Sequence, residues 1–205
     1  MMQADKFCTR LSNGLLGTLL GCISAAAFSA NLDVEVKDTA RLPLSGAVVY
    51  LKAKNAPLLK PMQQVAISQQ GKQFVPQMQV VTTGTAIEFP NRDSFRHHVY
   101  SFSAPKPFEL KLYVGKPKAP IVFDKPGVVV LGCNIHDHMI GWVVVLDTPI
   151  FTRSDENGLA QFKDLKPGEY SLHVWHQDQL FGRSTFQLKM QLEQQNQKVT
   201  LIMNE

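Results

Sequence analysis

The feature that most constrains the fold is a series of short segments in which apolar and polar residues alternate with period two. "LDVEVKD" (32–38) and "GEYSLHVWH" (168–176) are two of them. Period-two alternation is typical of half-buried β-strands. Turn-forming sequences such as "DKPG" (124–127) and "DENG" (155–158) separate many of the segments. No stretch keeps helical periodicity for three turns, so we predict an all-β chain built as an antiparallel sandwich or barrel.

The expected strands divide by pattern into a central unit and two flanking parts, without a linker or an internal repeat. Residues 63–147 hold most of the side chains that can carry chemistry, whereas 31–62 and 148–205 read as plain sandwich strands. Chain ends are often neighbours within a domain, so we expect the two flanking parts to pair with each other. Further strands are expected at 46–53, 77–91 (two strands around Gly84), 97–104, 108–114, 127–133, 141–147, 158–165, 184–192 and 197–203.

The first 29 residues have the pattern of a secretory signal peptide. Two basic residues precede a mostly apolar run at 15–27, and small residues lead to a cleavage site after Ser29. Lipidation of Cys22 is the alternative, but the apolar run continues well past that cysteine. No later stretch reaches the roughly 18 apolar residues of a transmembrane helix. We therefore expect an exported, periplasmic protein without a transmembrane segment.

Net charge and the number of cysteines limit the classes of function that this chain can have. The formal net charge is +4, without a basic run or aromatic residues interleaved with lysines, so nucleic acid is not an expected partner. Cys8 and Cys22 lie in the predicted leader, which leaves Cys133 alone in the mature chain. A single cysteine forms no internal disulfide. It is a core thiol, an intermolecular partner, a nucleophile or a metal ligand.

The segment "GCNIHDHMIGW" (132–142) favours a metal site. Cys133, His136 and Met139 follow one another at intervals of three, and His97 lies upstream in "NRDSFRHHVYS". Loops at one end of a β-sandwich cluster in space, so the distant histidine can join the other three. Two imidazoles, a thiolate and a weak axial thioether define a blue-copper electron-transfer site. Structural zinc sites rarely use methionine, so one copper ion is the expected cofactor.

Residues 63–147 resemble a cupredoxin, with a ligand loop similar to that of amicyanin. The resemblance rests on "IEFPNRDSFRHHV" and "CNIHDHMIGWVVV", and Gly84 with Thr85 matches the turn before the strand that leads to the first ligand. It implies a Greek-key β-sandwich whose copper ligands are His97, Cys133, His136 and Met139. It also implies a periplasmic, type 1-like copper protein that transfers electrons to and from redox partner proteins and is not an enzyme.

The flanking segments carry a second resemblance. "VEVKDTARLPLSGAVVYL" and "SDENGLAQFKDLKPGEYSLHVWH" look like the start and finish of a small carboxypeptidase-regulatory-like sandwich. The whole chain resembles bacterial exported proteins labelled methylamine utilization proteins. The predicted organisation is therefore a signal peptide (1–29), a cupredoxin unit (63–147) and a small sandwich formed by 31–62 and 148–205.

Three departures from the cupredoxin pattern keep alternatives open. His98 stands where cupredoxins usually have asparagine, "VVLGC" replaces an aromatic-rich approach to the cysteine, and His138 is an additional histidine. His98 or His138 could bind copper in place of an expected ligand. Both histidines, together with Asn91, are therefore candidates for additional ligands or for residues that support the ligands.

Other functions are compatible with the same residues. A copper carrier or sensor without redox turnover would use the extra histidines, and a metal-free binding sandwich would leave Cys133 as a core thiol. Cys133 with His136 as nucleophile and base is disfavoured, since no helix N-terminus or glycine-rich oxyanion loop accompanies them. His173 and His176 fall on opposite faces of a predicted strand, which argues against a second site.

Overall fold

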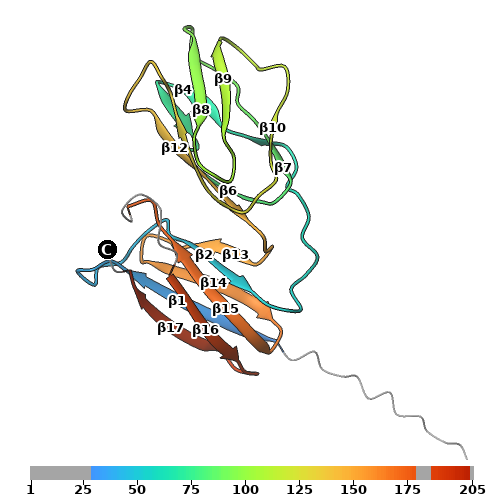
Figure 1. The fold of residues 1–205 in the computed structure, drawn as a ribbon. Helices are drawn as coiled ribbons and strands as arrows, with labels where there is room; N and C mark the ends of the chain where they lie inside the picture. The colour runs from blue at the N-terminus through green and yellow to red at the C-terminus, as the bar shows by residue number, and fades with distance from the viewer. Residues whose placement is uncertain (1–28, 179–185, 204–205) are drawn as a thin grey trace, which may run out of the picture.

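The computed structural model describes residues 29–178 and 186–203, and this part of the chain is all-β. Residues 1–28 of the predicted signal peptide, Cys22 among them, lie outside the described residues. Figure 1 shows two lobes, one formed by the central part of the chain and the other by its two ends. Within the described residues, no helix is long and apolar enough to cross a membrane.

The lower lobe in Figure 1 is a sandwich built from both ends of the chain. One sheet has the order β14-β1-β17 and the other the order β13-β2-β15-β16. The strands are β1 (Ala30–Lys37), β2 (Val48–Lys52), β13 (Phe151–Arg153), β14 (Leu159–Leu165), β15 (Gly168–Trp175), β16 (Phe186–Leu192) and β17 (Gln197–Ile202).

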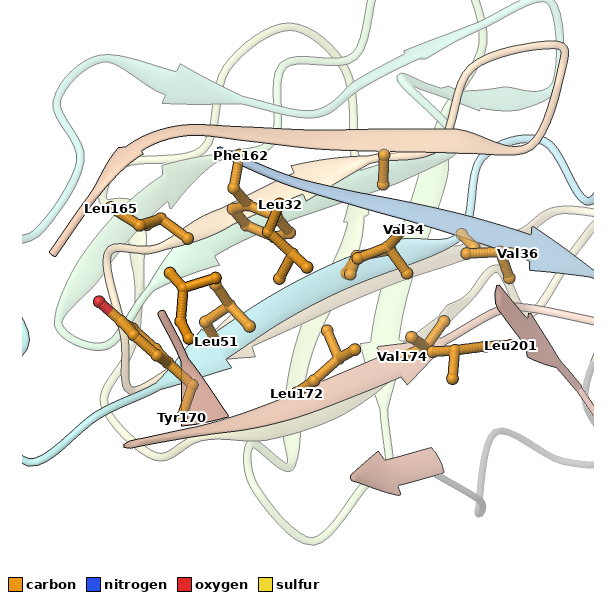
Figure 2. Packing of buried hydrophobic residues seen from close by; sticks show 14 of the residues in the cluster. Leu32, Val34, Val36, Leu51, Phe162, Leu165, Tyr170, Leu172, Val174 and Leu201 are labelled. Carbon is orange, nitrogen blue, oxygen red and sulfur yellow. The ribbon is translucent and has the colours of Figure 1, made fainter. Parts of the chain in front are cut away.

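Alternation along these strands builds the core of the flanking sandwich. Every second residue of β1 is buried, from Ala30 to Val36, and its polar neighbours stay partly exposed. Figure 2 shows Leu32 and Val34 of β1 turned toward the same interior as Leu172 and Val174 of β15. The period-two pattern therefore sets which face of each strand enters the core.

The upper lobe is the sandwich that carries the candidate site. A five-stranded sheet has the order β6-β12-β11-β8-β9, a three-stranded sheet has the order β10-β7-β3, and β4 and β5 form a separate hairpin. The strands are β3 (Val65–Ala66), β4 (Ser68–Gln70), β5 (Gln73–Val75), β6 (Met78–Thr82), β7 (Thr85–Glu88), β8 (His97–Ser101), β9 (Phe108–Tyr113), β10 (Ile121–Phe123), β11 (Gly127–Gly132) and β12 (Ile140–Leu146).

A third apolar cluster joins the two sandwiches. Val80 and Val144 of the central unit pack with Val48 and Trp175 of the flanking sandwich, and Tyr50 and Trp142 lie at the border of this cluster. An ion pair between Lys52 and Asp147 at 2.8 Å stands beside it, with both side chains 41% exposed. Exposed ion pairs contribute little, so we attribute the association mainly to apolar burial.

The all-β fold class is confirmed, with one correction to the expected strand directions. An antiparallel sandwich or barrel was predicted and most strand pairs are antiparallel, but β1 pairs with β17, β3 with β7 and β6 with β12 in parallel. Parallel neighbours require crossover connections, and β1 and β17 come from opposite ends of the described chain. The alternation of side chains is the same in both kinds of pair, so the local sequence cannot distinguish them. The short strands β3, β4, β5, β10 and β13 were also not expected.

Candidate metal centre

The candidate ligands come from two segments that the sheet brings together. His97 opens β8, directly after the loop that follows β7. Cys133, His136 and Met139 lie in the connection 133–139 between β11 and β12, whose ladder closes at Gly132 and Ile140. β8 lies next to β11, where Tyr100 pairs with Gly132. This register brings the start of β8 and the 133–139 loop to the same end of the sandwich.

The thiol of Cys133 lies between the two imidazoles. Its Sγ atom is 3.8 Å from Nδ1 of His97 and 3.8 Å from Nδ1 of His136. One ligand atom from each of the three residues lies within 4.8 Å of the other two. Metal–ligand bonds of about 2.0–2.3 Å that meet at trigonal angles would separate the ligand atoms by about 3.5–3.8 Å. The three side chains therefore fit around one small ion.

Burial shapes the chemistry of these groups. His97 is 0% exposed, Cys133 4% and Met139 1%, whereas His136 is partly exposed. Cys133 and Met139 belong to the central apolar core, which supplies a site with restricted access to water. The expected thioether is thus buried in the same core as the thiol. Apolar surroundings of this kind tune the redox potential of a bound metal.

A carboxylate outside the predicted ligand set also holds the first histidine. Oδ2 of Asp93 lies 2.8 Å from Nε2 of His97, and the same carboxylate accepts hydrogen bonds from the amides of Gly71 (2.8 Å) and Lys72 (3.1 Å). Because an ionised carboxylate only accepts, Nε2 carries the proton and the lone pair of Nδ1 faces the thiol. The spacing Asp-x-x-x-His was visible in the sequence, but the contact with the β4–β5 turn was not.

The electrostatics favour an ionised carboxylate and a neutral imidazole. Burial raises the pKa of Asp93, and hydrogen bonds from His97, Gly71 and Lys72 outweigh it, so the pKa lies below its ordinary value. Burial lowers the pKa of His136, and repulsion from Lys72, and from His97 when that ring is protonated, lowers it further. A neutral imidazole is the form that binds a metal, so His136 is prepared for coordination at neutral pH.

The ring of Phe95 covers the two histidines on the solvent side. Its centroid lies 5.0 Å from that of His97 and 5.7 Å from that of His136. Nζ of Lys72 stands 5.9 Å from the centre of the same ring, and Phe95 itself is 39% exposed. Sequence reasoning missed this residue, because an aromatic side chain in a loop carries no signal of what it covers.

The three remaining candidates lie outside the His97–Cys133–His136 group. Nε2 of His98 lies 2.8 Å from Oε1 of Glu109, consistent with adjacent strand residues pointing to opposite faces. Nδ2 of Asn91 donates to the carbonyl oxygens of Phe95 and Tyr113, which fixes the loop before His97. His138 is exposed, and its ring centroid lies 6.2 Å from that of His136. The structure thus gives His98 and Asn91 partners within the protein.

The other two histidines have separate surroundings. His173 stacks on Tyr50 with ring centroids 4.8 Å apart, and its Nε2 atom lies 3.0 Å from the Ser171 hydroxyl. Nε2 of His176 lies 3.0 Å from the carbonyl oxygen of Ser45. Among the described residues, the group of His97, Cys133 and His136 is the one set of histidine, cysteine and acidic side chains arranged to hold an ion.

Comparisons with known proteins give likenesses to copper proteins. No protein-family profile and no curated protein matches the chain. A copper-containing nitrite reductase (NirK) from Thermus scotoductus SA-01 matches at 27% identity over 54% of this chain and 28% of its own, with a TM-score of 0.39. A purple cupredoxin from Nitrosopumilus maritimus matches at 22% identity over 40% of this chain and all of its own, with a TM-score of 0.37.

A reduced amicyanin variant is similar in the same way. It matches at 19% identity over 47% of this chain and 99% of its own, with a TM-score of 0.36. The chain spans little more than a quarter of the nitrite reductase. Because all three TM-scores lie below 0.5, the interpretation of the site rests on strand order and side-chain geometry. On these grounds the central unit is a β-sandwich with a His-Cys-His cluster that could hold a metal ion.

Proposed function

We propose that the protein binds one copper ion through His97, Cys133, His136 and Met139 and exchanges electrons with partner proteins in the periplasm. The observation that carries this proposal is the buried thiol with an imidazole Nδ1 atom at 3.8 Å on either side. Bound copper would supply a one-electron couple, which is the chemistry of a thiolate–imidazole–thioether set. Export to the periplasm and the partners are expectations from the sequence alone.

Each ligand has a distinct role in this proposal. The Cys133 thiolate would provide the electronic coupling, and the two imidazoles would complete the set of strong ligands. Met139 would supply a weak thioether ligand that tunes the potential. Asp93 keeps His97 in the tautomer that leaves Nδ1 free. The apolar core around Cys133 and Met139 limits the rearrangement of the site when the charge changes.

A metal-free sandwich fits these residues less well. His97 is 0% exposed, and burial of an imidazole costs free energy unless both ring nitrogens have partners. Asp93 satisfies one nitrogen, while the other faces a thiol at 3.8 Å, a weak hydrogen-bond partner at best. A metal ion would satisfy the second nitrogen fully. Such an arrangement is easier to explain as a ligand set than as core packing.

The test is a titration of the purified mature protein with Cu(II), followed by visible absorption and EPR, on the wild type and on Cys133→Ser. We expect a strong thiolate-to-copper band near ~600 nm that vanishes in the variant. His173→Gln, which changes a histidine outside the cluster, is the control and should retain the band. A weak spectrum that survives Cys133→Ser would show copper bound without the thiolate, and no stoichiometric copper would refute the proposal.

A copper carrier without redox turnover is the second candidate, and the partly exposed His136 with the exposed His138 beside it favours it. Reduction followed by dialysis separates the two functions. An electron-transfer site retains Cu(I) and returns to the same absorption band on reoxidation. A carrier loses the ion to a Cu(I) chelator such as bathocuproine disulfonate within the same period.

A further inference from the structure

His138 is the histidine that has no role in the proposed copper site and no side-chain contact among the described residues that explains its place in the fold. The other five side chains each have a polar neighbour, whereas the side chain of His138, within the described part of the chain, takes part in no hydrogen bond or ion pair. It is exposed and lies in the second turn of the 133–139 loop. The partners of the others are Asp93 for His97, Glu109 for His98, Cys133 for His136, Ser171 for His173 and Ser45 for His176.

The proposed ligands differ in their exposure to solvent. His97 and Met139 are essentially inaccessible, and Cys133 is 4% exposed, although a surface cavity is lined in part by Cys133 and Met139. His136 is the one member of the set that is partly exposed. An imidazole edge that an ion from solution can meet is therefore present at His136. The His138 ring stands edge-on to His136, with ring centroids 6.2 Å apart.

A small cavity lies beside His138 and Met139. It has a volume of about 120 Å³, and its lining includes both His138 and Met139. At ~30 Å³ of liquid volume per water, it has room for roughly four waters, or for an ion that keeps part of its hydration shell. The amides of Gln73 and Gln77 contribute polar groups to the same wall. An ion held at His138 thus has a partly polar space beside Met139.

The loop holds His138 in this place. The amide of Met139 donates to the carbonyl oxygen of His136 at 2.9 Å, and the amide of Ile140 donates to that of His138 at 3.1 Å. These bonds close the turn, so the exposed imidazole is presented at the rim while the next side chain enters the core. The exposed imidazole of His138 and the buried thioether of Met139 are therefore adjacent in the sequence of a short loop.

We propose that His138 is the entry ligand for copper, which captures the ion at the surface and transfers it to His136 and the buried donors. This inference rests on the proposed copper function. Each step replaces one ligand by another without a change in the oxidation state of copper. The thiol proton of Cys133 passes to solvent when the thiolate binds. His138 is then free again once the ion is seated.

Loading kinetics test the proposal, with Cu(II) alone as the probe. Stopped-flow growth of the thiolate band is compared for the apo wild type, His138→Ala and Asn134→Ala, an exposed polar residue of the same loop. Release is followed after excess EDTA is added to the loaded proteins. An entry ligand accelerates capture and release equally, so His138→Ala should slow both about tenfold and leave the Kd within twofold. Asn134→Ala should match the wild type.

Four results would overturn this assignment. An unchanged loading rate in His138→Ala refutes the entry role alone, since copper still binds. An altered band or EPR spectrum makes His138 a permanent ligand instead. Equal slowing in Asn134→Ala assigns the effect to the loop and not to the imidazole. A wild type that develops no thiolate band refutes the thiolate-ligated copper site, and the entry role falls with it.

Discussion

At the scale of single residues, the candidate site depends on how His97 is oriented. Its imidazole bridges two segments, with Nε2 at the Asp93 carboxylate and Nδ1 at the Cys133 thiol. The carboxylate is fixed in turn by the amides of Gly71 and Lys72 in the β4–β5 turn. The φ angle of Lys72 is 59°, an uncommon value for a residue with a side chain, and this conformation belongs to the turn whose amides bind the carboxylate.

We predict that Asp93→Ala weakens copper binding about 10- to 100-fold, because His97 loses the partner that fixes its tautomer and ring angle. Asp93→Asn retains an acceptor for Nε2–H and should recover part of the affinity. Competition with a chelator of known affinity measures the effect, and EPR should show a broader, altered signal in the alanine variant. Asp124→Ala removes an exposed carboxylate paired with Lys106 and serves as the control. Equal affinity in Asp93→Ala and Asp124→Ala would contradict the orienting role.

At the scale of elements, tight turns decide how strands approach one another. The "DENG" turn leads from β13 in one sheet to β14 in the other, and the Asp155 carboxylate accepts hydrogen bonds from the amides of Asn157 (2.9 Å) and Leu159 (2.8 Å). Gly158 follows with φ +73°, and a Cβ there would stand 2.5 Å from the carbonyl oxygen of Val36. The absence of a side chain lets this turn lie directly against β1.

We predict that Gly158→Ala destabilises the protein by about 2 kcal/mol or more, from backbone strain and from the clash with β1. Gly115 is a matched control, because its φ is +76° and a Cβ there would meet nothing within 4 Å. Gly115→Ala should therefore lose stability through backbone strain alone, by about 1–2 kcal/mol. Urea unfolding followed by circular dichroism compares the two. Equal losses would show that the contact with β1 contributes nothing.

At the scale of the whole molecule, the two sandwiches share an apolar interface on the outer face of the five-stranded sheet. Trp175 ends β15 and is 1% exposed, and it packs with Val144 and Leu146 of β12 and with Met78 and Val80 of β6. Its neighbour Val174 points into the core of the flanking sandwich instead. Of these two consecutive residues of β15, Val174 therefore belongs to the core of the flanking sandwich and Trp175 to the interface between the two sandwiches.

We predict that Trp175→Ala removes about 3–5 kcal/mol of packing and uncouples the two sandwiches. Calorimetry should then resolve two unfolding transitions, of which added copper raises only one, while the wild type unfolds in a single copper-sensitive transition. The copper spectrum should stay unchanged, since the interface does not include the candidate ligands. Leu172→Ala, in the core of the flanking sandwich, is the control for a loss of stability within that unit. A single copper-sensitive transition in Trp175→Ala would refute this coupling.

The sequence by itself determined the strands and the local half of the site. Period-two alternation sets which side chains face a core, and it therefore predicted the all-β class and most of the strands. The order Cys133, His136, Met139 lies within one short loop, so its spacing alone could indicate a common ligand. The opposite directions of His97 and His98 also follow from alternation, although the sequence analysis left His98 open as a ligand.

Only the tertiary structure decided the contacts between distant segments. The approach of His97 to Cys133 depends on the pairing of β8 with β11, and the parallel pairs depend on crossovers that no local pattern encodes. The contact between Asp93 and the β4–β5 turn, the cover by Phe95 and the rim position of His138 arise in the same way. The alternating pattern of a strand is compatible with many partner strands and many pairing registers. Only the arrangement that buries the apolar faces of both sandwiches and the interface between them is stable, and this requirement selects one pairing.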